Sequence, residues 1–193
     1  MVKRRKRKRI AERRGPFPTI ALTPNDCWSL DFMSDALATG RRFRTLGVID
    51  TCTREALAIE VDTSLPGARV VRVLERLITK RGRPTEIVLD NGPELISRIF
   101  DQWAADQEIT LGFIEPGKPE QNAVMESFNG RFRDECLNSH WFTSLADARQ
   151  TIETWRRDYN QVRPHSSLAY RTPTEMYAQL TGSFTMMEAA GLS

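Results

Sequence analysis

The chain has 193 residues, of which 40% are hydrophobic, and it carries a formal net charge of +3. That length and apolar content suffice for one domain with its own core, and the apolar runs are too short for a transmembrane segment or a secretory signal. The three cysteines, Cys27, Cys52 and Cys136, form no CxxC pair, so we expect no structural zinc site and a cytoplasmic location with reduced thiols.

The first 24 residues are predicted to be a basic arm followed by a linker. Residues 1–14 hold nine basic side chains and one acid, whereas the rest of the chain carries a net charge of −5. Because such a run repels itself, we expect residues 1–24 to be disordered and to bind nucleic acid by neutralising phosphates. A solvated or targeting tail is the alternative interpretation. The arm residues expected to contact DNA are Lys3, Arg4, Arg5, Lys6, Arg7, Lys8 and Arg9.

Alternating apolar residues predict three strands at the start of the body. Residues 27–33 alternate so that the apolar side chains share one face while Asp31 points to the other. Residues 43–51 and 56–61 are two more strand-like runs joined by a short polar stretch, which predicts an antiparallel hairpin.

Helices and strands then alternate along the chain. Helical spacing over 68–80 is followed by a strand that ends at Leu89, a helix around 95–104 and a strand over 109–114. This succession requires right-handed crossovers and hence parallel pairing, whereas the earlier hairpin is antiparallel. We therefore predict an α/β fold with a five-stranded mixed sheet flanked by helices.

The last part of the chain is predicted to be helical and then irregular. A long helix is expected over 121–137, and a second one begins after Ser144, a residue suited to cap it. The core is predicted to span 25–162. Residues 163–193 form a C-terminal extension, in which His165 is expected to make a structural hydrogen bond and the end of the chain to fray.

Three acids stand out by position. Asp31 lies inside the first strand, Asp90 follows the fourth strand at its carboxyl end, and Glu126 lies in the long helix. At about 100° per residue with Met125 at zero, Glu126 falls at about 100°, on the border of the apolar face, with Arg133 at about 80° in the same strip. Converging carboxylates suit hard divalent cations and phosphoryl transfer, although ordinary surface acids are the alternative interpretation.

Long sequence blocks resemble the catalytic core of bacterial insertion-sequence transposases of the DDE class, the integrase-like products of a second reading frame and relatives of retroviral integrases. The resemblance covers roughly residues 25–177, and 35 residues separate Asp90 from Glu126, as in the family. The blocks are WSLDFMSDAL, GRRFRTLGVIDTCTREALAIEVDTSL, VLDNGPE, PGKPEQNAVMESFNGRFRDECLN and YNQVRPHSSLAYRTPTEM.

The resemblance implies a ribonuclease-H-like fold and a metal-dependent site. Asp31, Asp90 and Glu126 would be the catalytic residues and the ligands of two Mg²⁺ ions, for which Mn²⁺ can substitute. The implied reactions are phosphodiester hydrolysis and DNA strand transfer, which together give DNA integration and recombination. Lys118 and Asn122, together with Arg133, are candidates for holding DNA phosphate or orienting the glutamate.

The resemblance also implies partners, and two alternative functions stay open. The partners are element-end and target DNA, further copies of the chain on DNA, and a helix-turn-helix product of a first reading frame. Family members usually carry a helix-turn-helix region ahead of the core, so we expect this chain to be truncated at its start or begun at an internal methionine. The alternatives are a nuclease of the same fold that cuts without joining, and a catalytically incompetent DNA-binding remnant that modulates a full-length transposase.

Overall fold

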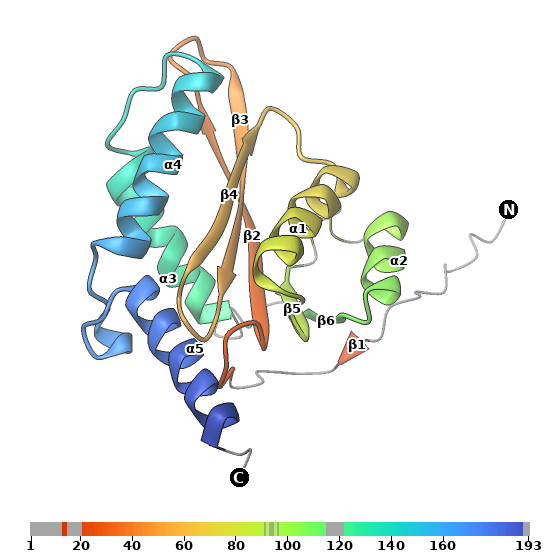
Figure 1. The fold of residues 1–193 in the computed structure, drawn as a ribbon. Helices are drawn as coiled ribbons and strands as arrows, with labels where there is room; N and C mark the ends of the chain where they lie inside the picture. The colour runs from red at the N-terminus through yellow and green to blue at the C-terminus, as the bar shows by residue number, and fades with distance from the viewer. Residues whose placement is uncertain are drawn as a thin grey trace, which may run out of the picture.

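The protein is described by a computed structural model that covers residues 13–14, 21–90, 92, 95, 97–114 and 122–190. A mixed sheet lies between two layers of helices (Figure 1). The spatial order of its strands is β1-β6-β5-β2-β3-β4. Their bounds are Arg13–Arg14 for β1, Cys27–Ala36 for β2, Arg42–Asp50 for β3, Ala56–Asp62 for β4, Glu86–Leu89 for β5 and Thr110–Phe113 for β6.

The predicted five-stranded mixed sheet is confirmed. Strands β2, β3 and β4 form an antiparallel meander, and β5 and β6 add to β2 in parallel, as the alternation of strands and helices requires. The two-residue strand β1 lies at the end of the basic arm, which was predicted to be disordered; it pairs in parallel with β6 and adds a sixth strand at that edge.

Helices cover both faces of the sheet, and each face has its own hydrophobic core. Helices α1 (Gly67–Arg81) and α2 (Arg98–Asp106) pack on one face, where Trp28 and Leu30 of β2 are fully buried. Helices α3 (Ala123–Phe132) and α4 (Leu145–Gln161) pack on the other. None of the helices in the described ranges is long and apolar enough to cross a membrane.

Aromatic contacts join α3 to α4 and thereby fix α3 on the sheet. The rings of Phe132 and Trp155 lie 5.0 Å apart, and those of Phe128 and Tyr159 lie 5.2 Å apart at a nearly perpendicular angle. Such edge-to-face pairs stabilise the contact beyond the area they bury. Ser144 caps α4 as predicted, because its hydroxyl accepts a hydrogen bond from the backbone N–H of Asp147.

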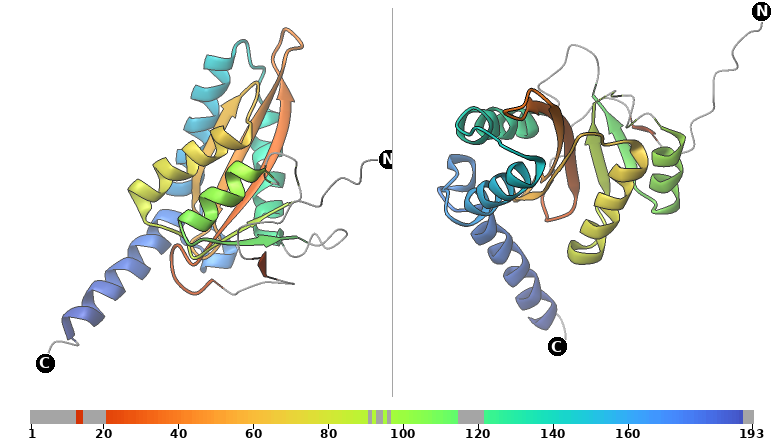
Figure 2. Two further views of the ribbon diagram at one scale, coloured as in Figure 1. Left: turned by 90° about the vertical axis from the view of Figure 1, so that its right-hand side faces the viewer. Right: turned by 90° about the horizontal axis from the view of Figure 1, so that it is seen from above.

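The structure departs from the sequence prediction after residue 132. The helix predicted over 121–137 ends as α3, and Arg133–Leu137 continue as one π-helical turn. The end of the chain, which we expected to fray, forms α5 (Pro173–Ala190), which projects away from the body (Figure 2).

A capping box explains the start of α5. The Thr172 hydroxyl accepts a hydrogen bond from the Glu175 N–H, and the Glu175 carboxylate accepts one from the Thr172 N–H. Farther along, the ring of Tyr177 lies 3.7 Å from the guanidinium carbon of Arg81 in α1, which ties the first turns of α5 to the body.

Candidate active site

Strands β2 and β5 bring two of the predicted acids to the same place. Ser29 pairs with Val88 in a parallel register, and continuing that register by two residues places Asp31 beside Asp90, directly beyond the carboxyl end of β5. Partners on adjacent parallel strands project to the same face of a sheet. Both carboxylates therefore belong to the face covered by α3.

The carboxylate of Asp31 is half-buried and held on both oxygens. Its Oδ1 accepts a hydrogen bond from the Phe32 N–H at 2.7 Å, and its Oδ2 accepts one from the side-chain amide of Asn129, on α3, at 2.6 Å. A short bond from a neutral donor to a carboxylate is of the stronger, charge-assisted kind. Asn129 therefore fixes the orientation of Asp31 from the helix side.

The turn after β5 holds Asp90. Its Oδ1 accepts a hydrogen bond from the backbone N–H of Gly92 at 2.9 Å, which is an Asx turn. The side chain is half-buried, so one oxygen is used by the turn while the group remains accessible at the sheet edge.

Glu126 lies in the first turn of α3 and is exposed. Its position on the helix agrees with the predicted angle, because its neighbours Met125 and Phe128 are buried against the sheet. A carboxylate in the first turn is also favoured by the helix dipole.

Asp90 and Glu126 both lie near enough to Asp31 to act on its charge. Burial raises the pKa of the Asp31 carboxyl above its ordinary value, the Phe32 N–H lowers it, Asp90 raises it, Asn129 lowers it, and Glu126 raises it again. Two acids from β5 and α3 thus act on a third in β2. Among the described residues, however, no three His, Cys, Asp or Glu side chains stand close enough together to hold a metal ion as they are.

The chemistry of the three side chains fits a hard divalent cation. All the donors are carboxylate oxygens, which Mg²⁺ prefers, and a bound cation would offset the repulsion that raises the pKa of Asp31. Glu126 is exposed and free of side-chain hydrogen bonds in the described part of the chain, so it can complete such a site by a change of rotamer.

The remaining predicted site residues are placed less centrally. Asn122 is buried, with 7% of its surface exposed, and its amide oxygen has no partner among the described residues. Arg133 donates a hydrogen bond to the carbonyl of Ser34, three residues beyond Asp31 along β2 and so about 10 Å from it. Lys118 and the arm residues 3–9 lie outside the described residues.

Sequence reasoning missed Asn129, although its signal was present. At about 100° per residue it falls at about 40° on the helix, within the strip that contains Glu126 and Arg133. A polar residue three positions after the glutamate, on the same side of the helix, was therefore a candidate to reach the sheet.

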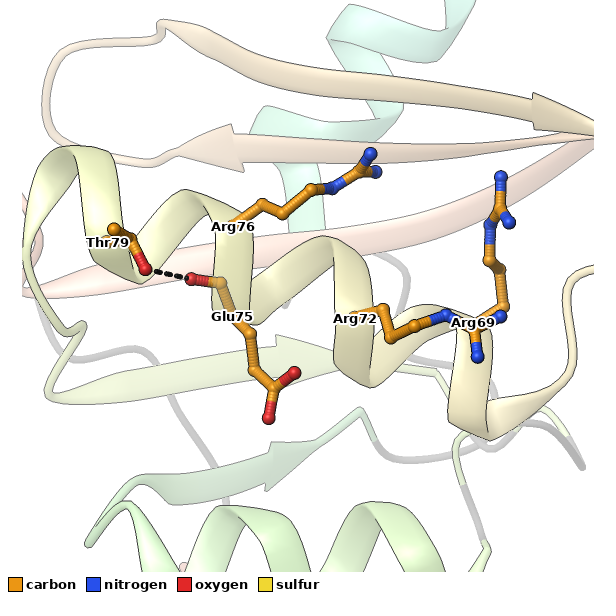
Figure 3. Close-up of a pocket in the computed structure, with 5 residues that line it drawn as sticks. All are labelled: Arg69, Arg72, Glu75, Arg76 and Thr79. Atoms are coloured by element: carbon orange, nitrogen blue, oxygen red, sulfur yellow. Dashed lines mark hydrogen bonds between the residues drawn. The ribbon is translucent and has the colours of Figure 1, made fainter.

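A hollow on α1 lies on the opposite face of the sheet from these acids (Figure 3). Two of its arginines are neutralised, because Arg69 and Arg76 both bind the carboxylate of Glu60, at 2.6 and 2.7 Å. This hollow therefore contributes nothing to the acidic site. Its lining residues are Arg69, Arg72, Glu75, Arg76 and Thr79.

Comparison with protein families gives consistent matches along the chain. The sequence matches the family described as "Integrase core domain" over residues 21–119 and again over 107–173. The 31.7 kDa protein of insertion element IS407 from Burkholderia multivorans is 53% identical over 156 residues, covering 81% of this chain and 56% of that protein. The 39.2 kDa protein of insertion element IS476 from Xanthomonas euvesicatoria is 52% identical over 176 residues, covering 91% of this chain and 51% of that protein. The chain thus spans about half the length of these curated relatives.

Solved structures with the same fold are retroviral. The HTLV-2 integrase catalytic core domain in complex with magnesium, in its trimeric form, aligns with a TM-score of 0.65 at 18% identity, covering 81% of this chain and 98% of that one. The simian T-cell lymphotropic virus intasome in complex with a PP2A regulatory subunit aligns with a TM-score of 0.69, also at 18% identity, covering 91% and 60%. At such identities the likeness concerns the fold, which is the ribonuclease-H-like fold that the sequence resemblance implied.

Proposed function

The chain belongs to the integrase core domain family, and from that premise we propose that it is the catalytic core of an insertion-element transposase. It would cut a phosphodiester at an element end and join the freed 3′ end to target DNA. The observation that carries the proposal is the register that sets Asp31 beside Asp90, together with the Asn129 bond that brings α3, the helix of Glu126, onto Asp31.

We assign the roles as follows. Asp31 and Asp90 would hold the divalent cations at the carboxyl end of β5, and Glu126 would complete the set of ligands from α3. When bound, two magnesium or manganese ions supply the charge that activates the attacking oxygen and stabilises the leaving oxygen in phosphoryl transfer. The protein keeps Asp31 oriented through Asn129 and Asp90 oriented through the turn at Gly92. Such supporting contacts fix the ligand geometry.

Both proposed substrates are DNA: the end of the element and the target. The basic arm would add non-specific affinity by displacing counterions, and Lys118, Asn122 and Arg133 remain candidates for phosphate contacts near the acids. Joining two DNAs requires their synapsis, which favours an assembly of several copies. The named dimeric and trimeric forms of the HTLV-2 core support this part of the proposal.

A strand-transfer assay tests the proposal. The chain is incubated with magnesium, labelled element-end DNA and a target plasmid, alongside Asp90→Asn, which preserves shape and removes the charge. Joined product that disappears in Asp90→Asn supports a transposase core. Nicking without joining indicates a nuclease, binding without products indicates a DNA-binding remnant, and joining that survives Asp90→Asn rejects the site.

A further inference from the structure

A second hollow lies beside α3, on the flank away from the acids. It has a volume of about 190 Å³, far above the roughly 10–15 Å³ that one water needs by the same measure. Ala123, Ser127 and Arg131 form its α3 wall at successive helical turns, at about 160°, 200° and 240° on the scale that puts Glu126 at about 100°. Its lining residues are Arg54, Ala123, Val124, Ser127, Phe128, Arg131, Tyr159, His165 and Ser167.

Two arginines of this hollow have no acidic partner in the part of the chain that the structure describes. Neither Arg54, in the turn between β3 and β4, nor Arg131 forms an ion pair with any residue that the structure describes. A third arginine nearby, Arg163, is by contrast paired with Glu135. Unpaired cations at the rim of a hollow favour an anionic ligand.

A neutral group holds Arg131 in place. Its Nη1 lies 3.2 Å from Nδ1 of His165, and because a guanidinium can only donate, Nδ1 is the acceptor. Burial, and then the charges of Arg131, Arg163 and Arg54, lower the pKa of His165, and the Tyr159 backbone opposes this shift. His165 therefore positions the guanidinium but leaves its charge uncompensated.

The hollow on α1 has a different balance of charge. There Arg69 and Arg76 bind Glu60, Arg72 has no ion pair in the described ranges, and Glu75 adds an acid to the lining (Figure 3). Beside α3, two arginines stand with the hydroxyls of Ser127 and Ser167, and none of the described lining residues is acidic. Arginine and hydroxyl donors together suit a phosphate group.

We propose that the hollow formed by Arg54, Arg131, Ser127 and Ser167 binds a backbone phosphate of the DNA that the acidic site acts on. This inference rests on the proposed function, because it takes DNA as the substrate. The α3 wall of the hollow is centred about 100° around the helix from Glu126, so the two lie less than one helix diameter, about 10 Å, apart. Each strand of a duplex carries one phosphate per about 3.4 Å of helix axis, so DNA at the acids can also present a phosphate to the hollow.

DNA binding measured over a range of salt concentrations tests the hollow directly. Affinity of the full chain for a labelled duplex is compared with that of Arg54→Asn and Arg131→Gln. Asparagine tolerates the left-handed backbone at position 54, where φ is 61°. Arg54→Asn also leaves the contact between Arg131 and His165 intact. Arg72→Gln, an exposed arginine on α1 without an ion pair in the described ranges, is the matched control.

Each hollow variant should weaken binding to all duplex sequences and reduce the slope of log affinity against log salt by about 1, whereas the control should keep both values. Slopes equal to that of the control overturn the inference. A titration with inorganic phosphate, followed by thermal unfolding, separates the two sources of phosphate. Stabilisation that is lost in both hollow variants, with unchanged DNA slopes, would show a small-anion site and reject DNA as the ligand.

Failure of this inference is distinguishable from failure of the proposed function. Unchanged slopes together with joined product sensitive to Asp90→Asn would reject the hollow and retain the transposase core. Reduced slopes without any cut or joined product would retain the phosphate contact and reject strand transfer.

Discussion

Replacing Asn129 by alanine should impair the site while leaving the fold intact. The substitution removes the 2.6 Å hydrogen bond to Oδ2 of Asp31, the one contact in the described chain that fixes this oxygen from α3. Asn129 touches neither DNA nor metal in this proposal, so it acts as a positioning residue. The loss of activity in Asn129→Ala should therefore be largest at low magnesium concentration, where cation binding limits the rate.

The size of the effect follows from the bond. A hydrogen bond to a charged group contributes about 1.5–3 kcal/mol, and loss of a supporting contact to a metal ligand costs about 10–100-fold in metal affinity or activity. Alanine recovers about 0.5 kcal/mol through its higher helix propensity, so the net loss of stability should be about 1–2.5 kcal/mol. The melting temperature should accordingly fall by about 2–10 °C.

The assay is strand transfer over a magnesium series, with thermal unfolding as the check on folding. Asn129→Ala should need about 10–100-fold more magnesium for half-maximal activity and should approach the native rate at saturation. Asn138→Ala, which removes the same kind of side chain from an exposed position beyond the π-helical turn, should behave like the native chain. A native magnesium dependence in Asn129→Ala would show that this contact does not position Asp31.

Three further predictions concern the fold around the site. Asp50→Ala removes a fully buried carboxylate that accepts three backbone N–H bonds in the turn region, so the free energy of unfolding should fall by about 3 kcal/mol or more, measured by urea titration. Burial chiefly lowers the pKa of His165 below 6.5, so this residue binds fewer protons in the folded state than in the unfolded state. The free energy of unfolding should therefore fall as the pH drops below 6.5, and urea unfolding curves of His165→Asn should lack this pH dependence. Burial raises the pKa of Cys27 and Cys136 to about 12 and that of Cys52 to about 11, so iodoacetamide at about pH 8 should label these thiols slowly unless urea is added.

The strand β2 was predictable because its apolar residues alternate with a clear period of two. Asp31 sits between the buried Leu30 and the partly buried Phe32, which pack toward α1 and α2, so alternation alone placed its carboxylate on the other face. The crossover rule then gave parallel pairing for the later strands. The two-residue strand β1 had no such signal, because a pairing that short is set by the neighbouring strand β6 rather than by its own pattern.

The C-terminal helix α5 escaped prediction because its stripe of apolar residues is weak. The local signal was the sequence Thr172-Pro173-Thr174-Glu175, which combines a capping box with proline at the first helical position. Capping chemistry, rather than periodicity, determines where this helix begins.

The acidic site illustrates why local sequence patterns could identify candidate residues but could not predict which of them lie together in the fold. Whether Asp31 and Asp90 meet depends on the register between β2 and β5, two strands more than fifty residues apart, and a shift of one residue would turn one carboxylate to the opposite face. The helix angle placed Glu126 and Arg133 in one strip, yet it could not foresee that Arg133 binds the carbonyl of Ser34 while Asn129 reaches Asp31.

Those outcomes follow from how far along β2 each turn of α3 lies, and the packing of Phe128 and Phe132 against α4 fixes that position. The aromatic contacts between the two helices therefore decide which polar side chain of the strip meets the acids, and a change in that packing would alter the site without touching any carboxylate.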